Sequence, residues 1–84
     1  MSELEDKFMD SVKKMRDTEK NISDEDRLYL YGLYKRVTEG ICNDPAPWSI
    51  QTLQYERWQS WYKNNKLDKN TAIQLYIQKV FELI

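Results

Sequence analysis

A lysine flanked by tyrosines stands out in segment 28–35, which reads Leu-Tyr-Leu-Tyr-Gly-Leu-Tyr-Lys. On a helix, Tyr31 and Lys35 are four residues apart and share a face, and Tyr34 lies about 60° from that face. The ammonium group supplies positive charge, and the phenol hydroxyls supply hydrogen-bond donors without a competing carboxylate. This spacing favours a site for an anion on one face of the helix.

Residues from two other segments could complete such a site. Arg57 precedes Trp58 in one segment of helical spacing, and Tyr76 lies in a later one. The planar guanidinium of an arginine suits a phosphate, because it can donate two parallel hydrogen bonds. Arg57 and Tyr76 could therefore converge with the tyrosine-lysine face of segment 28–35.

Each of these residues also has a simpler structural interpretation. Trp58, Trp61 and Tyr34 lie at helical spacing, where aromatic residues more often fill a core than bind a ligand. Lys35 by itself has the character of a solvated surface lysine. Gly32 in mid-helix costs about 1 kcal/mol relative to alanine, which indicates that another helix or a ligand approaches the backbone closely. Taken singly, none of these residues establishes a function.

The composition limits the possible chemistry. A chain of 84 residues suffices for one domain, and we expect residues 1–84 to form it. It has no histidine and a single cysteine, Cys42, which excludes Ser-His-Asp and Cys-His catalysis, ordinary zinc sites and an internal disulfide. We therefore predict no catalytic residue, no metal and no cofactor.

The charge balance and the hydropathy pattern limit the partners. Thirteen Lys and Arg oppose fourteen Asp and Glu, and the pI is about 5.4, which argues against nucleic acid as a partner. The charged start has no apolar signal-peptide region, and no stretch approaches the roughly 20 apolar residues of a membrane span. We expect a cytoplasmic protein without stable membrane insertion, although transient membrane contact stays open.

Two helices are expected in the first half of the chain. Ser2 and Glu5 form a capping box for the first helix, and segment 16–21 reads as a loop or a frayed end. Ser23 begins a second capping box, and Gly40 stands where a left-handed C-terminal cap is wanted. The apolar positions at helical spacing are Phe8, Val12 and Met15 in the first helix, and Leu28, Tyr31 and Tyr34 in the second.

Two more helices are expected after an irregular stretch at residues 41–47, which contains both prolines. Ser49 is the predicted cap of the third helix, which ends at Asn64 and Asn65, and Asp68 caps the fourth. The third helix carries Leu53, Trp58, Trp61 and Tyr62; the fourth has a broad apolar stripe of Ile73, Tyr76, Ile77, Val80, Phe81 and Ile84. With no alternating strand pattern, the sequence predicts an all-α fold, a four-helix bundle.

The order of these signals resembles the acyl-CoA-binding protein family. The family pattern is Leu-x-x-Tyr-x-x-Tyr-Lys-Gln-Ala-Thr-x-Gly-Asp, then Pro, then Lys-Trp-x-x-Trp, then Ala-x-x-x-Tyr. The resemblance runs from Ser23 to Leu83 without a needed gap, and helix 1 matches more loosely. The pattern is met by Leu28, Tyr31, Tyr34, Lys35, Thr38, Gly40, Asn43, Pro47, Trp58, Trp61, Ala72 and Tyr76.

The resemblance implies an up-down-down-up bundle with a surface bowl that binds medium- to long-chain fatty acyl-CoA esters. It also implies a monomeric intracellular carrier and pool former that is not an enzyme. The residues implied for the adenine and phosphate end of coenzyme A are Tyr31, Tyr34, Lys35, Arg57, Tyr76 and Lys13, with Lys14 as the alternative register to Lys13. The residues proposed for the acyl groove are Met9, Leu28, Leu30, Gly32 and Leu53.

Several positions depart from the family pattern. Arg57 replaces the usual lysine and keeps the charge, whereas Leu53 and Tyr55 stand where basic residues are frequent, and Ile41 replaces an acidic residue. Fewer cations near the mouth could weaken nucleotide binding or alter the acyl preference. One alternative is therefore a helical protein-interaction module that keeps the scaffold without the ligand. A nucleic-acid binder is a second alternative, disfavoured by the absence of a basic block.

Overall fold

The computed structural model describes residues 2–18, 22–49 and 52–84. These residues form four α-helices, α1 (Glu3–Thr18), α2 (Asp24–Glu39), α3 (Leu53–Tyr62) and α4 (Lys69–Leu83), and a short 3-10 helix, η2 (Lys63–Lys66). No strand occurs in these ranges, so the all-α prediction is confirmed. None of the helices in these ranges has the length and apolar character needed to cross a membrane.

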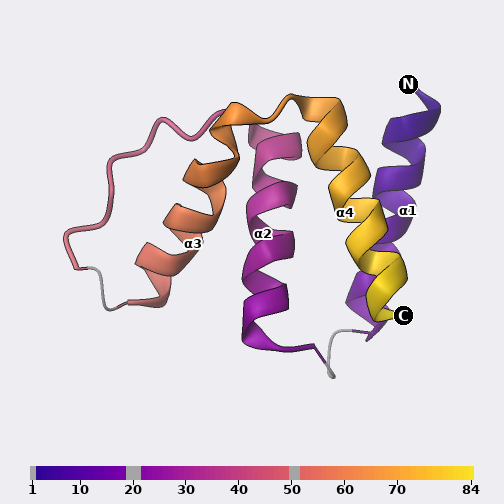
Figure 1. Cartoon of the computed structure of the whole chain (residues 1–84), viewed down its shortest axis with the longest axis horizontal. Helices are drawn as coiled ribbons and strands as arrows, with labels where there is room; N and C mark the ends of the chain where they lie inside the picture. Colours follow the sequence, from indigo (N-terminus) through magenta and orange to yellow (C-terminus); the bar gives the residue numbers. More distant parts are fainter. Residues whose placement is uncertain (1, 19–21, 50–51) are drawn as a thin grey trace.

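The helices follow the up-down-down-up order that the resemblance implies. α1 and α4 run in one direction, and α2 and α3 run in the other (Figure 1). α2 packs against α3 on one side and α4 on the other, and α4 packs against α1. Because α2 and α3 are parallel, the chain between them must travel back along the length of the bundle, outside α3.

Three of the predicted helix starts are confirmed in detail. Ser2, Ser23 and Asp68 each accept a hydrogen bond from the backbone N–H three residues later, at 2.9–3.1 Å. Each bond satisfies one of the N–H groups that the first turn of a helix leaves unpaired. Hydrogen bonds from the side chain and the backbone of Thr71 hold the pKa of Asp68 below its usual value.

Other helix boundaries differ from the prediction. The cap of α3 is Thr52 and not Ser49, because the Thr52 hydroxyl accepts the backbone N–H of Tyr55 at 3.1 Å. Segment 16–21 was predicted as a loop or a frayed helix end; α1 continues through Thr18, so the loop alternative is wrong for residues 16–18, and residues 19–21 lie outside the described ranges. α3 ends at Tyr62, and the chain tightens into η2 before the expected end at Asn64 and Asn65.

The apolar core lies where α1, α2 and α4 meet. Within the described ranges, no residue of its buried cluster comes from α3. Since α4 packs on α1 and α2, its stripe is buried on that side only, and Phe81 and Ile84 remain 67% and 53% exposed. The buried cluster consists of Phe8, Val12, Met15, Leu30, Leu33, Ala72, Ile73, Tyr76 and Val80.

α2 and α3 meet by close approach of their backbones. A Cβ atom built on Gly32 would lie 2.1 Å from the carbonyl oxygen of Ser60, so only glycine fits at this position. The side chain of Asn64, which is buried, donates to the same oxygen at 3.0 Å. The close neighbour that the mid-helix glycine predicted is therefore another helix.

Hydrogen bonds tie the connection before α3 to α3 and η2. Asn65 holds Cys42 twice, accepting its N–H at 2.8 Å and donating to its carbonyl at 3.1 Å. The indole N–H of Trp58 donates to the carbonyl of Asp44 at 2.9 Å. Gly40, with φ of +89°, has the positive φ expected of a C-terminal cap, but its ψ of −146° is not left-handed helical.

Candidate functional site

A hollow of about 630 Å³ opens on the surface where α1 and α2 face the start of α3. Most of its aliphatic walls come from α1 and α2, and arginines stand among them. We call it the α1-side hollow; it is lined by Val12, Met15, Arg16, Ile22, Asp24, Arg27, Leu28, Leu30, Tyr31, Tyr34, Leu53, Glu56, Arg57 and Tyr76.

A second hollow of about 480 Å³ lies between α2, α3 and the connection before α3. We call it the α3-side hollow; it is lined by Tyr31, Lys35, Asp44, Pro45, Pro47, Leu53, Gln54, Arg57, Trp58 and Trp61. Tyr31, Leu53 and Arg57 line both hollows, so the two adjoin. Together they form one surface depression, which we call the bowl.

Arg57 and Tyr31 form the shared wall of the bowl. The guanidinium carbon of Arg57 lies 5.8 Å from the ring centroid of Tyr31, within the range of a cation–π contact. Arg57 is exposed and Tyr31 is half-buried, so the arginine can reach a ligand from either hollow. This pair joins a residue of α3 to a residue of α2, as the sequence suggested.

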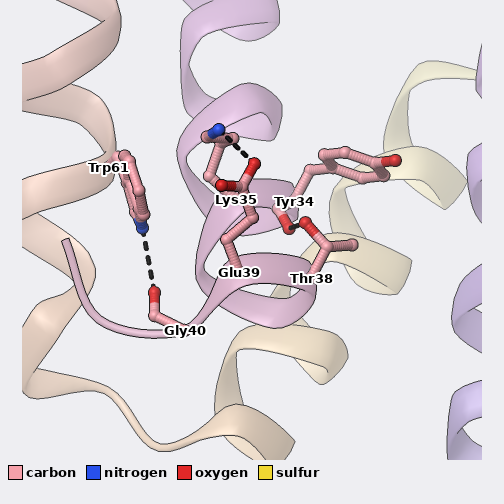
Figure 2. Close-up of polar contacts among 6 residues, drawn as sticks. All are labelled: Tyr34, Lys35, Thr38, Glu39, Gly40 and Trp61. Atoms are coloured by element: carbon pink, nitrogen blue, oxygen red, sulfur yellow. Dashed lines mark hydrogen bonds and ion pairs between the residues drawn. The ribbon is translucent and has the colours of Figure 1, made fainter.

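Lys35 lies deeper in the α3-side hollow. Its Nζ is 4.6 Å from the ring centroid of Trp61, whose indole N–H donates to the carbonyl of Gly40 at 2.9 Å. The ammonium also forms an ion pair with Glu39, one helical turn later (Figure 2). The hydrogen bond from Lys35 to Glu39 raises the pKa of Lys35. The prediction that no carboxylate competes for this lysine is therefore wrong.

Tyr76 brings α4 to the bowl. Its ring meets Phe8 edge-on with centroids 5.0 Å apart, and burial raises the pKa of its phenol to about 12. Tyr34 also raises this pKa and the positive charge of Arg16 lowers it; both residues line the α1-side hollow together with Tyr76. The hydroxyl therefore stays protonated at neutral pH, as a hydrogen-bond donor must.

The structure brings most of the predicted binding residues together. Of the residues predicted for the nucleotide end, those on α2, α3 and α4 line the bowl; of those predicted for the acyl groove, the leucines of α2 and α3 do. The predicted residues that line the bowl are Tyr31, Tyr34, Lys35, Arg57, Tyr76, Leu28, Leu30 and Leu53.

Four candidate residues, one of them an alternative, lie elsewhere. Lys13 and Met9 are exposed on α1 and line neither hollow. Lys14, the alternative to Lys13, also lines neither hollow and forms an ion pair with Asp10 at 3.3 Å. Gly32 also lines neither hollow, because it is buried against the carbonyl of Ser60 in α3.

Sequence reasoning missed Arg16, which lines the α1-side hollow. At 100° per residue, Arg16 lies about 70° from the centre of the buried stripe of α1, and Lys13 lies about 130° from it. A helical wheel drawn on Phe8, Val12 and Met15 could therefore have identified Arg16 as the cation nearest the bowl.

The bowl mixes both signs of charge. Its cations come from all of α1, α2 and α3, and carboxylates stand among them. The lining cations are Arg16, Arg27, Lys35 and Arg57, and the lining carboxylates are Asp24, Asp44 and Glu56. A polyanion could be held by the cations only if it avoided these carboxylates.

The chain is similar to proteins with one common description. The sequence pattern of the family described as "Acyl CoA binding protein" matches residues 5–80. The solved structure of Acyl-CoA-Binding Protein 2 of Oryza sativa superposes with a TM-score of 0.88 at 32% identity, covering 95% of this chain and 89% of that one.

Two curated relatives differ in how much of them is matched. Diazepam-binding inhibitor-like 5 of Rattus norvegicus is 37% identical over 62 residues, which are 74% of this chain and 71% of that protein. Enoyl-CoA delta isomerase 2 of Homo sapiens is 34% identical over 76 residues, which are 90% of this chain but only 19% of that enzyme.

Proposed function

The chain belongs to the acyl-CoA-binding protein family, and from that membership we propose that its bowl binds fatty acyl-CoA esters. The observation that carries the proposal is the shared wall of Tyr31 and Arg57, which joins an aliphatic hollow to one that holds Lys35. An acyl-CoA ester needs both, because one end is a highly charged nucleotide and the other is a hydrocarbon chain.

The nucleotide end is proposed to contact the residues that combine charge with hydroxyl donors. A 3′-phosphate carries close to two negative charges and is held best by charge-assisted hydrogen bonds. Lys35 and Arg57 would supply the cations, and the hydroxyls of Tyr31 and Tyr34, both half-buried residues, would supply neutral donors. Tyr76 and Arg16 would close the site on the side of α1 and α4.

The acyl chain is proposed to lie along the leucines of the bowl. Leu28 is half-buried, Leu30 is buried and Leu53 is exposed, so the three offer apolar surface at different depths. Burying a methylene contributes about 0.8 kcal/mol. Each added methylene should therefore tighten binding severalfold until the chain reaches the end of the apolar surface.

We further propose that the protein acts as a monomeric carrier and pool former for medium- to long-chain acyl-CoA in the cytoplasm. Binding of this kind needs no base, metal or activated nucleophile, so we propose a binder and not an enzyme. The similarity to the human isomerase covers a fifth of that enzyme, and it does not carry the isomerase activity to this chain.

Calorimetric titration of the folded protein with palmitoyl-CoA, coenzyme A and palmitate tests the proposal. We expect tight binding of the thioester and far weaker binding of coenzyme A or palmitate alone, because the bowl would contact the nucleotide and the acyl chain at the same time. The affinity for acyl-CoA esters should then rise stepwise with the length of the acyl chain. No heat with any of the three ligands would instead favour the helical interaction module that keeps the scaffold alone.

Single substitutions locate the nucleotide end. Lys35→Ala should weaken palmitoyl-CoA binding by about 2 kcal/mol, the value of a charge-assisted hydrogen bond. Arg16→Ala should also weaken it, whereas Lys13→Ala removes the same charge outside the bowl and should not. If Arg16→Ala and Lys13→Ala weaken palmitoyl-CoA binding equally, the phosphate does not lie beside Arg16 in the bowl.

A further inference from the structure

Lys35, which lines the α3-side hollow, already has a carboxylate partner, Glu39, one helical turn later on α2 and outside the lining of the hollow. Its ammonium donates to a carboxylate oxygen of Glu39, and the two side chains are 20% and 53% exposed (Figure 2). Trp61 lies on another side of the same ammonium, and the Nζ atom of Lys35 is 4.6 Å from the centroid of the Trp61 ring. An anion that enters the α3-side hollow therefore meets a lysine whose charge is already paired.

The needs of the helix do not explain an acid at position 39. Glu39 is the last residue of α2, where the negative end of the helix dipole disfavours a carboxylate. The pair also runs from lysine to glutamate, which is the weaker orientation at this spacing. Both considerations leave the pairing of Glu39 with Lys35 as the clearest role of this side chain.

We propose that Glu39 is an intramolecular competitor that sets the affinity of the bowl for the nucleotide phosphates by occupying Lys35. The inference rests on the proposed function, because it assumes that Lys35 receives a phosphate. It assigns to Glu39 a negative contribution to binding, opposite in sign to the contributions of Lys35 and Arg57.

The physical basis is competition for one cation. If a phosphate displaces Glu39, the ion pair is lost. If the carboxylate stays, it lies beside the phosphate, and like charges repel. Either course lowers the affinity for a ligand that carries the phosphates, and the factor should be the same for coenzyme A and for palmitoyl-CoA. A fatty acid without the nucleotide should feel neither effect.

Another carboxylate, Asp44, lines the α3-side hollow itself, which Glu39 does not, and its charge also raises the pKa of Lys35. Asp44 belongs to the connection before α3, and its backbone carbonyl accepts the indole N–H of Trp58. Because a substitution of Glu39 leaves Asp44 in place, the comparison isolates the carboxylate that pairs directly with the lysine.

The test is the variant Glu39→Gln, which keeps the shape of the side chain and removes its charge. Titrations use coenzyme A, palmitoyl-CoA and palmitate against wild type, Glu39→Gln, Lys35→Ala and the double variant. Glu3→Gln is the matched control, because Glu3 pairs with a lysine at the same spacing on α1, at 3.6 Å, and that lysine, Lys7, lines neither hollow.

We expect Glu39→Gln to bind coenzyme A and palmitoyl-CoA about threefold to tenfold more tightly, as an interaction between partly screened charges allows. Palmitate binding should not change, and Glu3→Gln should match wild type. The gain should disappear when Lys35 is alanine, because the competition acts through that lysine.

The outcomes separate this inference from the proposed function. If wild type binds palmitoyl-CoA and Glu39→Gln binds it no more tightly, the competition is refuted and the proposed function stands. A gain that persists in the Lys35→Ala background also refutes it, because the effect would then be general repulsion. If neither wild type nor Glu39→Gln binds coenzyme A or palmitoyl-CoA, the proposed function and this inference fail together.

Discussion

The two sides of α2 are held by different forces. Toward α1 and α4, α2 packs Leu30 and Leu33 into the apolar cluster. Toward α3, it offers Gly32 to the backbone of Ser60, and hydrogen bonds of Trp58, Trp61 and η2 side chains secure the neighbouring chain.

This difference matters for the bowl, which spans both sides. Burial of apolar surface is non-directional and scales with area, whereas a close backbone contact and hydrogen bonds require defined geometry. The cluster includes Tyr76 of α4, and Tyr29 and Tyr34 of α2 pack against it, so it holds these tyrosines in place. The contact of α2 with α3 fixes where Arg57 stands relative to Tyr31.

The largest effect is expected from Leu33→Ala on the cluster side. Leu33 is fully buried, and truncation of a buried leucine costs the lost burial and leaves a cavity, about 3–4 kcal/mol in all. Urea unfolding, monitored by far-ultraviolet circular dichroism, measures this change in the free energy of unfolding. Leu53→Ala makes the same change at an exposed position and should alter the free energy of unfolding by less than about 0.5 kcal/mol.

A smaller loss of stability, but a larger loss of binding, is expected from Gly32→Ala. The new methyl group would push α3 away from α2 and lower the free energy of unfolding by about 2–3 kcal/mol. The cost of overpacking outweighs the better helix propensity of alanine. Palmitoyl-CoA affinity should fall as Arg57 moves from Tyr31.

Gly40→Ala is the control for Gly32→Ala. No atom lies within 4 Å of the added methyl group, and the positive φ of +89° should cost about 1 kcal/mol. An increase in stability for Gly32→Ala, as in an ordinary exposed helix, would show that the contact with Ser60 is not close.

Asn65→Ala should lower the free energy of unfolding by about 1–2 kcal/mol, because it leaves the backbone N–H and C=O of buried Cys42 without their partner. Amide hydrogen exchange at Cys42 should accelerate more than exchange in the core of α4. Asn70→Ala, at an exposed position, serves as the comparison. Unchanged exchange at Cys42 would mean that the connection does not depend on Asn65.

A dependence of stability on alkaline pH is expected from Tyr76. Its folded pKa of about 12 lies above the unfolded value near 10, so folding favours the protonated phenol. This stabilisation is complete below pH 10 and is lost as the pH rises toward 12.

Urea midpoints at pH 8 and pH 11 test this dependence. Tyr76→Phe should reduce the loss of stability at pH 11, and Tyr62→Phe, which changes an exposed ring, should leave that loss as it is in wild type. If Tyr76→Phe and wild type lose equal stability between these pH values, burial of the Tyr76 phenol does not control its titration.

The helix starts could be predicted because they depend on local chemistry. Ser23 and Asp68 cap their helices with the backbone N–H three residues later, and this geometry needs no distant partner. The start of α3 was misplaced because Ser49 and Thr52 are both competent caps. Sequence alone does not say which one the returning connection brings into position.

The candidate site was predicted best where it lies on one helix. Tyr31, Tyr34 and Lys35 share the face that their spacing predicts. Glu39 was missed although it follows Lys35 by four residues, so the sequence carried the signal. Arg16 was missed because the α1 residue, Lys13, was predicted from the family resemblance and not from the position of the buried stripe.

The sequence by itself determined the helices, most of their caps and the family, because spacing and capping are properties of short segments. Only the tertiary structure decided that Gly32 packs against Ser60 and that Arg57 meets Tyr31. These pairs join residues far apart in the chain, and their contacts depend on how α3 returns beside α2. Distance along the sequence carries no information about such an approach, whereas the packing of helices fixes it.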